Sequence, residues 1–273
     1  VVWRIDRFER VLELYDAWEE KPVWPPRRFS DDALIHVLED RWAAVAEPDG
    51  RLVVLDLLDG RTLVEARLDP GESAPALAAL WLLRHDGRFL VVTNHAAEDD
   101  TVLNAQNRRF VQPMPGVFSQ PIRLGWAYGF DEDGKPAWPK PVKIENQQLI
   151  VDQPPGLPLL VFATRVILPN LNGEARFRLA VLAIDKRSGR VVCRYDDEGQ
   201  VHMFELSADP RRHTISATTQ QHVITMRLTD EPWPEGDPSL PPVENKQPEM
   251  PRMLRALFRS VLEPGARMEE PEP

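Results

Sequence analysis

The feature that most constrains this chain is a strand–turn–strand pattern that occurs three times. In the clearest copy, residues 179–195, an apolar run ends at Asp185, a polar turn closes at Gly189, and a second β-rich run follows. A second copy spans residues 52–64, and a looser one spans residues 126–138. A supersecondary unit that recurs in the sequence predicts a repeat fold made of small antiparallel sheets.

Short β-rich runs separated by turn signals extend this pattern over most of the chain. Asp59-Gly60 between two apolar runs is a strong hairpin signal, because glycine readily adopts the positive φ of a primed turn. A helix over residues 33–39, capped by Ser30, is the alternative for the first run. The predicted strands are 33–39, 42–47, 51–58, 62–68, 79–84, 88–95, 125–131, 159–168, 175–185, 190–196, 201–206, 213–219 and 222–228.

The two ends of the chain differ from this β-rich middle. Residues 1–5 favour a short strand, and residues 6–19 are predicted as an amphipathic helix that Pro22 ends. That helix rests on apolar residues at three- and four-residue steps: Ile5, Phe8, Val11, Leu12, Tyr15 and Trp18. We expect this stripe to pack on the rest of the domain, with binding to a partner as the alternative.

The predicted organisation is therefore an amino-terminal helix and linker (1–32), β-repeats (33–229) and a tail (230–273). Ten of the 27 prolines fall in the last 45 residues, which favours an extended tether with one short helix over residues 252–262. An irregular insertion, Ala96 to Pro121, interrupts the second unit, and a loop of this length is typically functional or mobile.

Composition excludes some partners. A formal net charge of −10 and a pI near 5.2 make nucleic acid an unlikely partner, because an acidic surface repels phosphates. The single cysteine, Cys193, rules out an intramolecular disulfide. No transmembrane helix is predicted, since the best apolar run, 157–168, is too short and contains Arg165. The start at Val1 without a leader indicates a processed chain or a segment of a longer one.

The repeated unit resembles a known family. Ala183-x-Asp185-x-x-x-Gly189 followed by Cys193 is similar to the small-x-Asp-x-x-x-Gly-x-x-x-Trp signature of the pyrroloquinoline-quinone-like (quinoprotein-type) β-propeller repeat. Asp56 with Gly60, and Gly134 with Trp138, keep parts of the same signature. The resemblance covers residues 33–228. Residues 125–158 also look like the carboxy-terminal propeller part of large bacterial repeat proteins.

This resemblance implies an all-β, mainly antiparallel fold of four-stranded blades, a β-propeller or partial propeller of about three to four blades. That number is small for a closed ring, so either upstream sequence or the amino-terminal segment would complete it. Asp56, Asp131 and Asp185 are then expected to be turn residues. The catalytic branch of the family sandwiches its quinone between a tryptophan and a disulfide of adjacent cysteines, beside a calcium ion. One cysteine cannot form that disulfide, so no cofactor is expected. The chain looks like the non-catalytic branch, which includes the outer-membrane protein-assembly lipoprotein, and an extracytoplasmic, periplasmic location follows from the resemblance alone.

No catalytic, cofactor-binding or metal-binding residue is predicted. The six histidines have no metal-ligand spacing, and Asp131-Glu132-Asp133-Gly134 lacks the later acids of a calcium loop. Ser119, Ser188 and Ser207 have no motif that links them to a histidine, and Cys193 is expected to be a small buried apolar residue. The histidines are His36, His85, His95, His202, His213 and His222.

The first hypothesis is therefore a non-catalytic scaffold that binds another protein, with the 96–121 insertion as its contact surface. Membrane association would require sequence outside this chain. A second hypothesis is an enzyme, a quinoprotein-like dehydrogenase or a hydrolase, with its site at the propeller axis or outside this segment. A third is a sensor of a small ligand or glycan that uses exposed tryptophans: Trp24, Trp126, Trp138 and Trp233.

Overall fold

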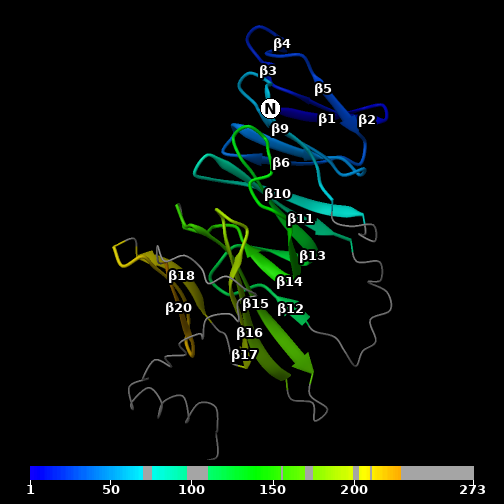
Figure 1. Cartoon of the computed structure of the whole chain (residues 1–273). Helices are drawn as coiled ribbons and strands as arrows, with labels where there is room; N and C mark the ends of the chain where they lie inside the picture. Colours follow the sequence, from blue (N-terminus) through cyan, green and yellow to red (C-terminus); the bar gives the residue numbers. More distant parts are fainter. Residues whose placement is uncertain are drawn as a thin grey trace, which may run out of the picture.

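The computed structural model describes residues 1–69, 76–96, 110–154, 156–169, 175–198, 203–209 and 211–228. In these ranges the chain is all-β, with antiparallel pairing throughout, and the predicted fold class is confirmed. Figure 1 shows the sheets following one another along the molecule in chain order. The strands form five layers.

Layer 1 contains β1 (Val2–Asp6), β2 (Glu9–Glu13), β3 (Tyr15–Asp16), β4 (Lys21–Pro22) and β5 (Arg27–Ser30). Layer 2 contains β6 (Leu34–Leu38), β7 (Trp42–Ala46), β8 (Arg51–Asp56) and β9 (Thr62–Arg67). Layer 3 contains β10 (Leu77–His85), β11 (Arg88–His95), β13 (Ser119–Phe130) and β14 (Val142–Ile150). Layer 4 contains β15 (Leu159–Pro169), β16 (Ala175–Asp185) and β17 (Val191–Glu198), with β12 (Phe110–Gln112) paired to β15. Layer 5 contains β18 (Phe204–Asp209), β19 (Thr214–Thr219) and β20 (Val223–Arg227).

A separate hydrophobic core lies between each pair of neighbouring layers, because the strands of the inner layers present apolar side chains on both faces. In β7, Ala43 and Val45 pack toward layer 1, while Trp42, Ala44 and Ala46 pack toward layer 3. The other cores join layers 3 and 4 and layers 4 and 5, around Phe162, Ile184, Leu90, Val181, Cys193, Phe204 and Ile215. Layers 3 and 4 share one hydrogen-bonded sheet through a single residue pair, Leu149 opposite Phe162, and the sheet folds back there. Face-to-face packing of this kind is how the blades of a propeller bury their surfaces.

The layers form an open series within the described residues. Figure 1 shows layer 1 and β18–β20 at opposite ends. The amino-terminal segment therefore does not close a ring with the last described layer. Layers 2, 3 and 4 correspond to the three predicted units and layer 5 to the predicted partial unit.

The predicted amino-terminal helix is wrong. Residues 6–19 form the hairpins β1–β2 and β3–β4, and the apolar side chains at helical spacing include turn residues: Phe8 is 85% exposed and Trp18 is 98% exposed. The alternative helix over residues 33–39 is also wrong, since β6 is a strand there. Within the described ranges, no helix has the length and apolar character to traverse a bilayer. The tail and its predicted helix lie outside the described residues.

The outer face of layer 1 is covered by charged side chains. Arg4 pairs with Glu13 (3.3 Å), and Arg28 pairs with Asp6 (3.3 Å) and Glu9 (2.7 Å). Beneath them Val11 is fully buried although no further layer covers it in the described residues. A polar outer face is typical of the end unit of a stacked array.

The turns of the repeat are built as the sequence predicts. The Oδ1 atoms of Asp56, Asp131 and Asp185 each accept a hydrogen bond from the backbone N–H two residues later, at 3.0 Å in every case. Gly60 and Gly189 close their turns at φ of +70° and +73°. These aspartates are therefore turn residues, as expected.

A fourth copy of this turn lies in layer 1 and escaped the sequence analysis. Asp16 Oδ1 accepts hydrogen bonds from the N–H groups of Trp18 (2.8 Å) and Glu19 (3.1 Å). Glu20 occupies the place of the glycine, at φ +51°, and Trp24 follows at the spacing of the family's tryptophan. Glutamate in the glycine position concealed the match.

Layers 1, 2 and 3 each contact the turn of the next layer at an equivalent place. The Trp24 ring covers Gly60, and the Trp138 ring covers Gly189, so closely that a Cβ on either glycine would lie 2.6–2.7 Å from ring atoms. Between layers 2 and 3, Val64 occupies the place of the tryptophan, and the backbone of layer 2 lies against the turn of layer 3. A Cβ on Gly134 would lie 2.8 Å from the Leu63 carbonyl oxygen. These contacts set how neighbouring layers align.

Candidate functional site

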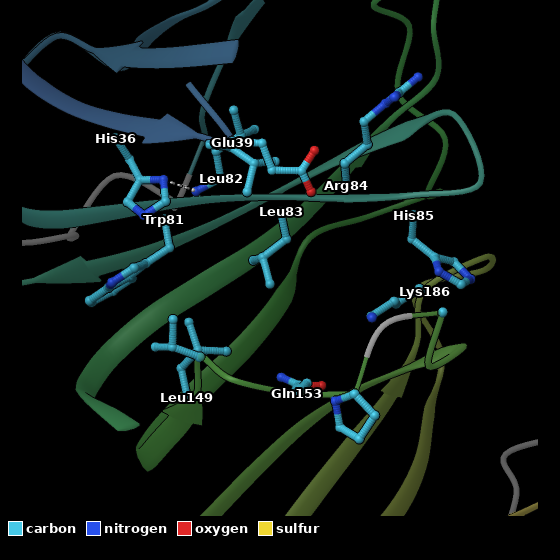
Figure 2. Close-up of a pocket in the computed structure, with 14 residues that line it drawn as sticks. His36, Glu39, Trp81, Leu82, Leu83, Arg84, His85, Leu149, Gln153 and Lys186 are labelled. Carbon is cyan, nitrogen blue, oxygen red and sulfur yellow. Dashed lines mark hydrogen bonds between the residues drawn. The ribbon is translucent and has the colours of Figure 1, made fainter. Parts of the chain in front are cut away.

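The candidate site is a cleft of about 180 Å³ where layers 2, 3 and 4 meet. It is bounded by the end of β6, the second half of β10, the connection after β14, and Lys186 in the β16–β17 turn (Figure 2). Its lining comprises His36, Leu38, Glu39, Trp81, Leu82, Leu83, Arg84, His85, Leu149, Val151, Gln153, Pro154, Gly156 and Lys186.

Hydrogen bonds between elements hold the walls in place. The Leu82 N–H donates to His36 Nδ1 (3.2 Å), which ties the edge of β10 to β6. Burial lowers the pKa of His36, which favours the neutral ring that this acceptor role requires. On the other side, the Gln153 amide donates to the carbonyls of Ile150 (2.7 Å) and Val161 (3.1 Å) and accepts from the Val161 N–H (2.9 Å). The cleft is therefore largely preformed.

The cleft has apolar walls and a polar rim. Trp81, Leu83 and Leu149 contribute apolar walls, and Figure 2 shows Leu83 between Glu39 above and Gln153 below. Arg84 stacks over the ring of Trp42, 4.4 Å from its centroid, which fixes the guanidinium beside the rim.

Lys186 is the most unusual residue of the cleft. Its side chain is 7% exposed, and Nζ donates to the Leu157 carbonyl (2.7 Å). Its backbone N–H donates to the Pro158 carbonyl (2.9 Å), and its carbonyl accepts from Trp138 Nε1 (3.0 Å). Burial lowers the pKa of the ammonium to about 8. The neighbouring His85 has its pKa lowered by burial and by the charge of Lys186.

Of the residues singled out in the sequence, the structure brings His36 and His85 to this one cleft. His95 instead lies edge-on to Trp126, with 4.9 Å between ring centroids, and His202 lies outside the described residues. The described residues contain no group of three or more His, Cys, Asp or Glu placed to hold a metal. Cys193 is buried, as expected, and burial raises its pKa to about 11.

Of the four tryptophans predicted to form a platform, the three within the described residues do not form an exposed one. Trp24 and Trp138 are buried at the contacts between layers, Trp126 is half-buried, and Trp233 lies outside the described residues. The predicted sensor role of Trp24 and Trp138 is therefore wrong, because each ring covers a turn of the next layer.

The predicted contact surface, residues 96–121, is only partly described. Residues 97–109 lie outside the described residues. In the remainder, β12 pairs with β15, Met114 is buried in the core of layers 4 and 5, and β13 begins at Ser119, so this part is not an irregular loop. Phe118 is a large apolar side chain of this part that is 60% exposed.

Sequence reasoning missed Lys186, although the sequence contained a signal. Lys186 directly follows the turn aspartate, and the residue in that place in layer 2 is Leu57, which is 1% exposed. A lysine at a position that is apolar and buried in another copy of the repeat is unusual, because lysine is rarely buried, and it marks a position worth examining. The cleft itself needs three layers to meet, which no local pattern predicts.

No protein-family model matches the chain, and no curated protein matches it. Among solved structures, BamB from Moraxella catarrhalis is similar over 83% of this chain and 84% of its own, at 10% identity and a TM-score of 0.23. The dihydro-heme d1 dehydrogenase NirN, in complex with DHE, is similar over 81% of this chain and 59% of its own, at 14% identity and TM-score 0.24. The computationally designed Ika8 protein is similar over 80% and 67%, at 9% identity and TM-score 0.26. TM-scores this low assign no function to the chain.

Proposed function

We propose that this chain is a non-catalytic scaffold of the β-propeller type, of the pyrroloquinoline-quinone-like repeat class, and that it binds a protein partner through the cleft between layers 2, 3 and 4. The observation that carries the proposal is the cleft itself: a preformed hollow with apolar walls and a polar rim. Its volume of about 180 Å³ lies below the roughly 300–1,000 Å³ of small-molecule pockets. A hollow of this size suits the anchoring side chains of a protein partner.

Rigidity supports the same proposal. The side chains of His36 and Gln153 use their polar atoms to join neighbouring elements. The hollow therefore need not be assembled when a partner arrives, and a preformed site loses less entropy on binding. The residues 96–121 remain a proposed second contact surface, which a deletion of residues 97–109 tests by its effect on partner binding.

A phage-displayed peptide library selected on the purified chain tests the cleft. Val151, 36% exposed at its rim, is replaced in Val151→Glu, and Leu58, an exposed residue of the β8–β9 turn, is replaced in the matched control Leu58→Glu. We expect selected peptides to bind the wild type and the control alike, and Val151→Glu at least tenfold more weakly. No enriched peptide, or peptides that bind Val151→Glu as tightly as the wild type, would contradict the proposal.

A further inference from the structure

Lys186 and Leu57 occupy the same place in two copies of the repeat. The N–H of each donates to a carbonyl of a preceding segment, Leu57 to Arg41 (2.7 Å) and Lys186 to Pro158 (2.9 Å). The carbonyl of each accepts the indole N–H of a tryptophan, at 2.9 Å from Trp24 and 3.0 Å from Trp138. The backbone setting is thus the same, and only the side chain differs.

That difference puts a positive charge where the other repeat has a hydrocarbon. Lys186 is more than nine-tenths buried, and Nζ takes part in none of the ion pairs found among the described residues, although the Asp86 carboxylate acts on it electrostatically and partly offsets the lowering of its pKa by burial. Buried charges in proteins are normally paired, because removing an ion from water is costly. The Leu157 carbonyl takes one of the three ammonium protons, so two remain for a ligand. Figure 2 shows the Lys186 side chain extending toward the space between Leu83 and Gln153, inside the cleft.

From this arrangement we infer that the cleft recognises an acidic side chain, Asp or Glu, two residues away from an apolar side chain in an extended segment of a partner protein, a spacing that places both side chains on the same face of the segment. The apolar side chain packs against Leu83 and Leu149, and the carboxylate binds the Lys186 ammonium. The inference rests on the proposed function and adds the chemistry of the partner.

The surroundings of Lys186 favour a side-chain carboxylate over a chain terminus or a phosphate. A terminal carboxylate is normally captured by free backbone N–H groups, but those of Leu82, Leu157 and Lys186 are already bonded. A phosphate carries more charge, and the Glu39 carboxylate already lines the cleft while the Asp86 carboxylate acts electrostatically on Lys186. A single negative charge fits this mixed rim best.

Peptides selected from the library described above provide the probe. Each is synthesised with blocked termini in two forms, one with its acidic residues and one with Asn or Gln in their place. Both are titrated by fluorescence anisotropy against the wild type and Lys186→Leu, which introduces the residue that the equivalent position of layer 2 already holds. We expect the wild type to bind the acidic form at least tenfold more tightly than the amide form. Lys186→Leu loses this preference but still binds the amide form.

The outcomes separate the two proposals. Equal binding of the acidic and amide forms by the wild type, or an acid preference that survives in Lys186→Leu, would overturn the role of Lys186 while leaving the peptide-binding cleft in place. Absence of any cleft-dependent peptide would overturn both. A selected peptide whose affinity depends on its free carboxy terminus would overturn the side-chain assignment.

Discussion

The indole N–H of Trp138 donates a 3.0 Å hydrogen bond to the carbonyl of Lys186, so that a residue of layer 3 holds the turn that carries the candidate ligand-binding lysine of layer 4. The same ring lies against Gly189, at the other end of that turn. Trp24 makes the equivalent pair of contacts with Leu57 and Gly60. The site and the alignment of the layers thus depend on one kind of contact.

Replacing Gly189 by alanine tests how closely the ring is packed. A Cβ there would lie 2.6 Å from Trp138 ring atoms, and the backbone has φ +73°. We expect Gly189→Ala to lower stability by about 3 kcal/mol, because both a steric and a conformational cost arise. Gly156→Ala is the matched control: φ is +74° and nothing lies within 4 Å, so it should lose about 1 kcal/mol. Urea unfolding followed by circular dichroism measures both, and equal losses would disprove the close packing.

Trp24→Phe and Trp138→Phe keep most of the apolar contact and remove the indole N–H. Each leaves a buried carbonyl without its donor, so we expect a loss of about 1–3 kcal/mol for each. The two rings lie in different cores, so the double variant should lose the sum of the single losses. Denaturant midpoints of the three variants check this, and a double loss far from the sum would show that the two contacts are energetically coupled or that the chain does not unfold in a single transition.

Lys186→Leu should stabilise the chain in a pH-dependent way. The pKa of Lys186 is lowered from 10.5 to about 8, so the folded state holds this proton less tightly than the unfolded state. The cost of the buried charge is therefore complete below about pH 8 and disappears as the pH rises toward 10.5. We expect Lys186→Leu to be more stable than the wild type by up to about 3 kcal/mol near pH 7.

Urea unfolding of both proteins at several pH values measures this difference. The advantage of Lys186→Leu should shrink steadily between about pH 8 and pH 10. Comparing the two proteins cancels the titration of other groups that they share. A constant advantage over this range would show that the ammonium is well solvated in the folded state.

Cys193 provides a probe of the core between layers 4 and 5. Burial raises the pKa of its thiol to about 11, and the residue is 5% exposed. Because the thiolate is the reactive form, we expect a thiol reagent near pH 8 to label the native chain only as fast as this core opens. Denaturant should restore full labelling. Rapid labelling of the native chain would contradict the packing of β17 against layer 5.

How far the sequence predicts the fold depends on whether local chemistry decides the structure. The hairpin at Asp185 and Gly189 was predictable, because an aspartate that bonds its own turn and a glycine at positive φ both act locally. The layer 1 hairpins were not predictable. Phe8 and Trp18 lie in turns and Val11 lies in a strand, and their spacing matches that of a helix by coincidence. Strand β14 also escaped, since four consecutive polar residues, 145–148, interrupt its apolar pattern after a proline-rich stretch.

The candidate site was less predictable than the fold. His36, Leu83, Gln153 and Lys186 come from three layers, and their proximity results from stacking, not from any motif. The sequence held a clue only for Lys186, and only by comparison with Leu57 in the other copy of the repeat. Departures from a repeat at buried positions are therefore worth examining in chains of this kind.

The tryptophan contacts join layer 1 to layer 2 and layer 3 to layer 4, each to its neighbour only. A pulling force applied to the two ends of the chain would act on these contacts in series, so that the weakest one breaks first. The link between layers 2 and 3, where Val64 stands in place of an indole, is the one that should yield early, and stretching single molecules would then release the chain in steps of about one layer's length.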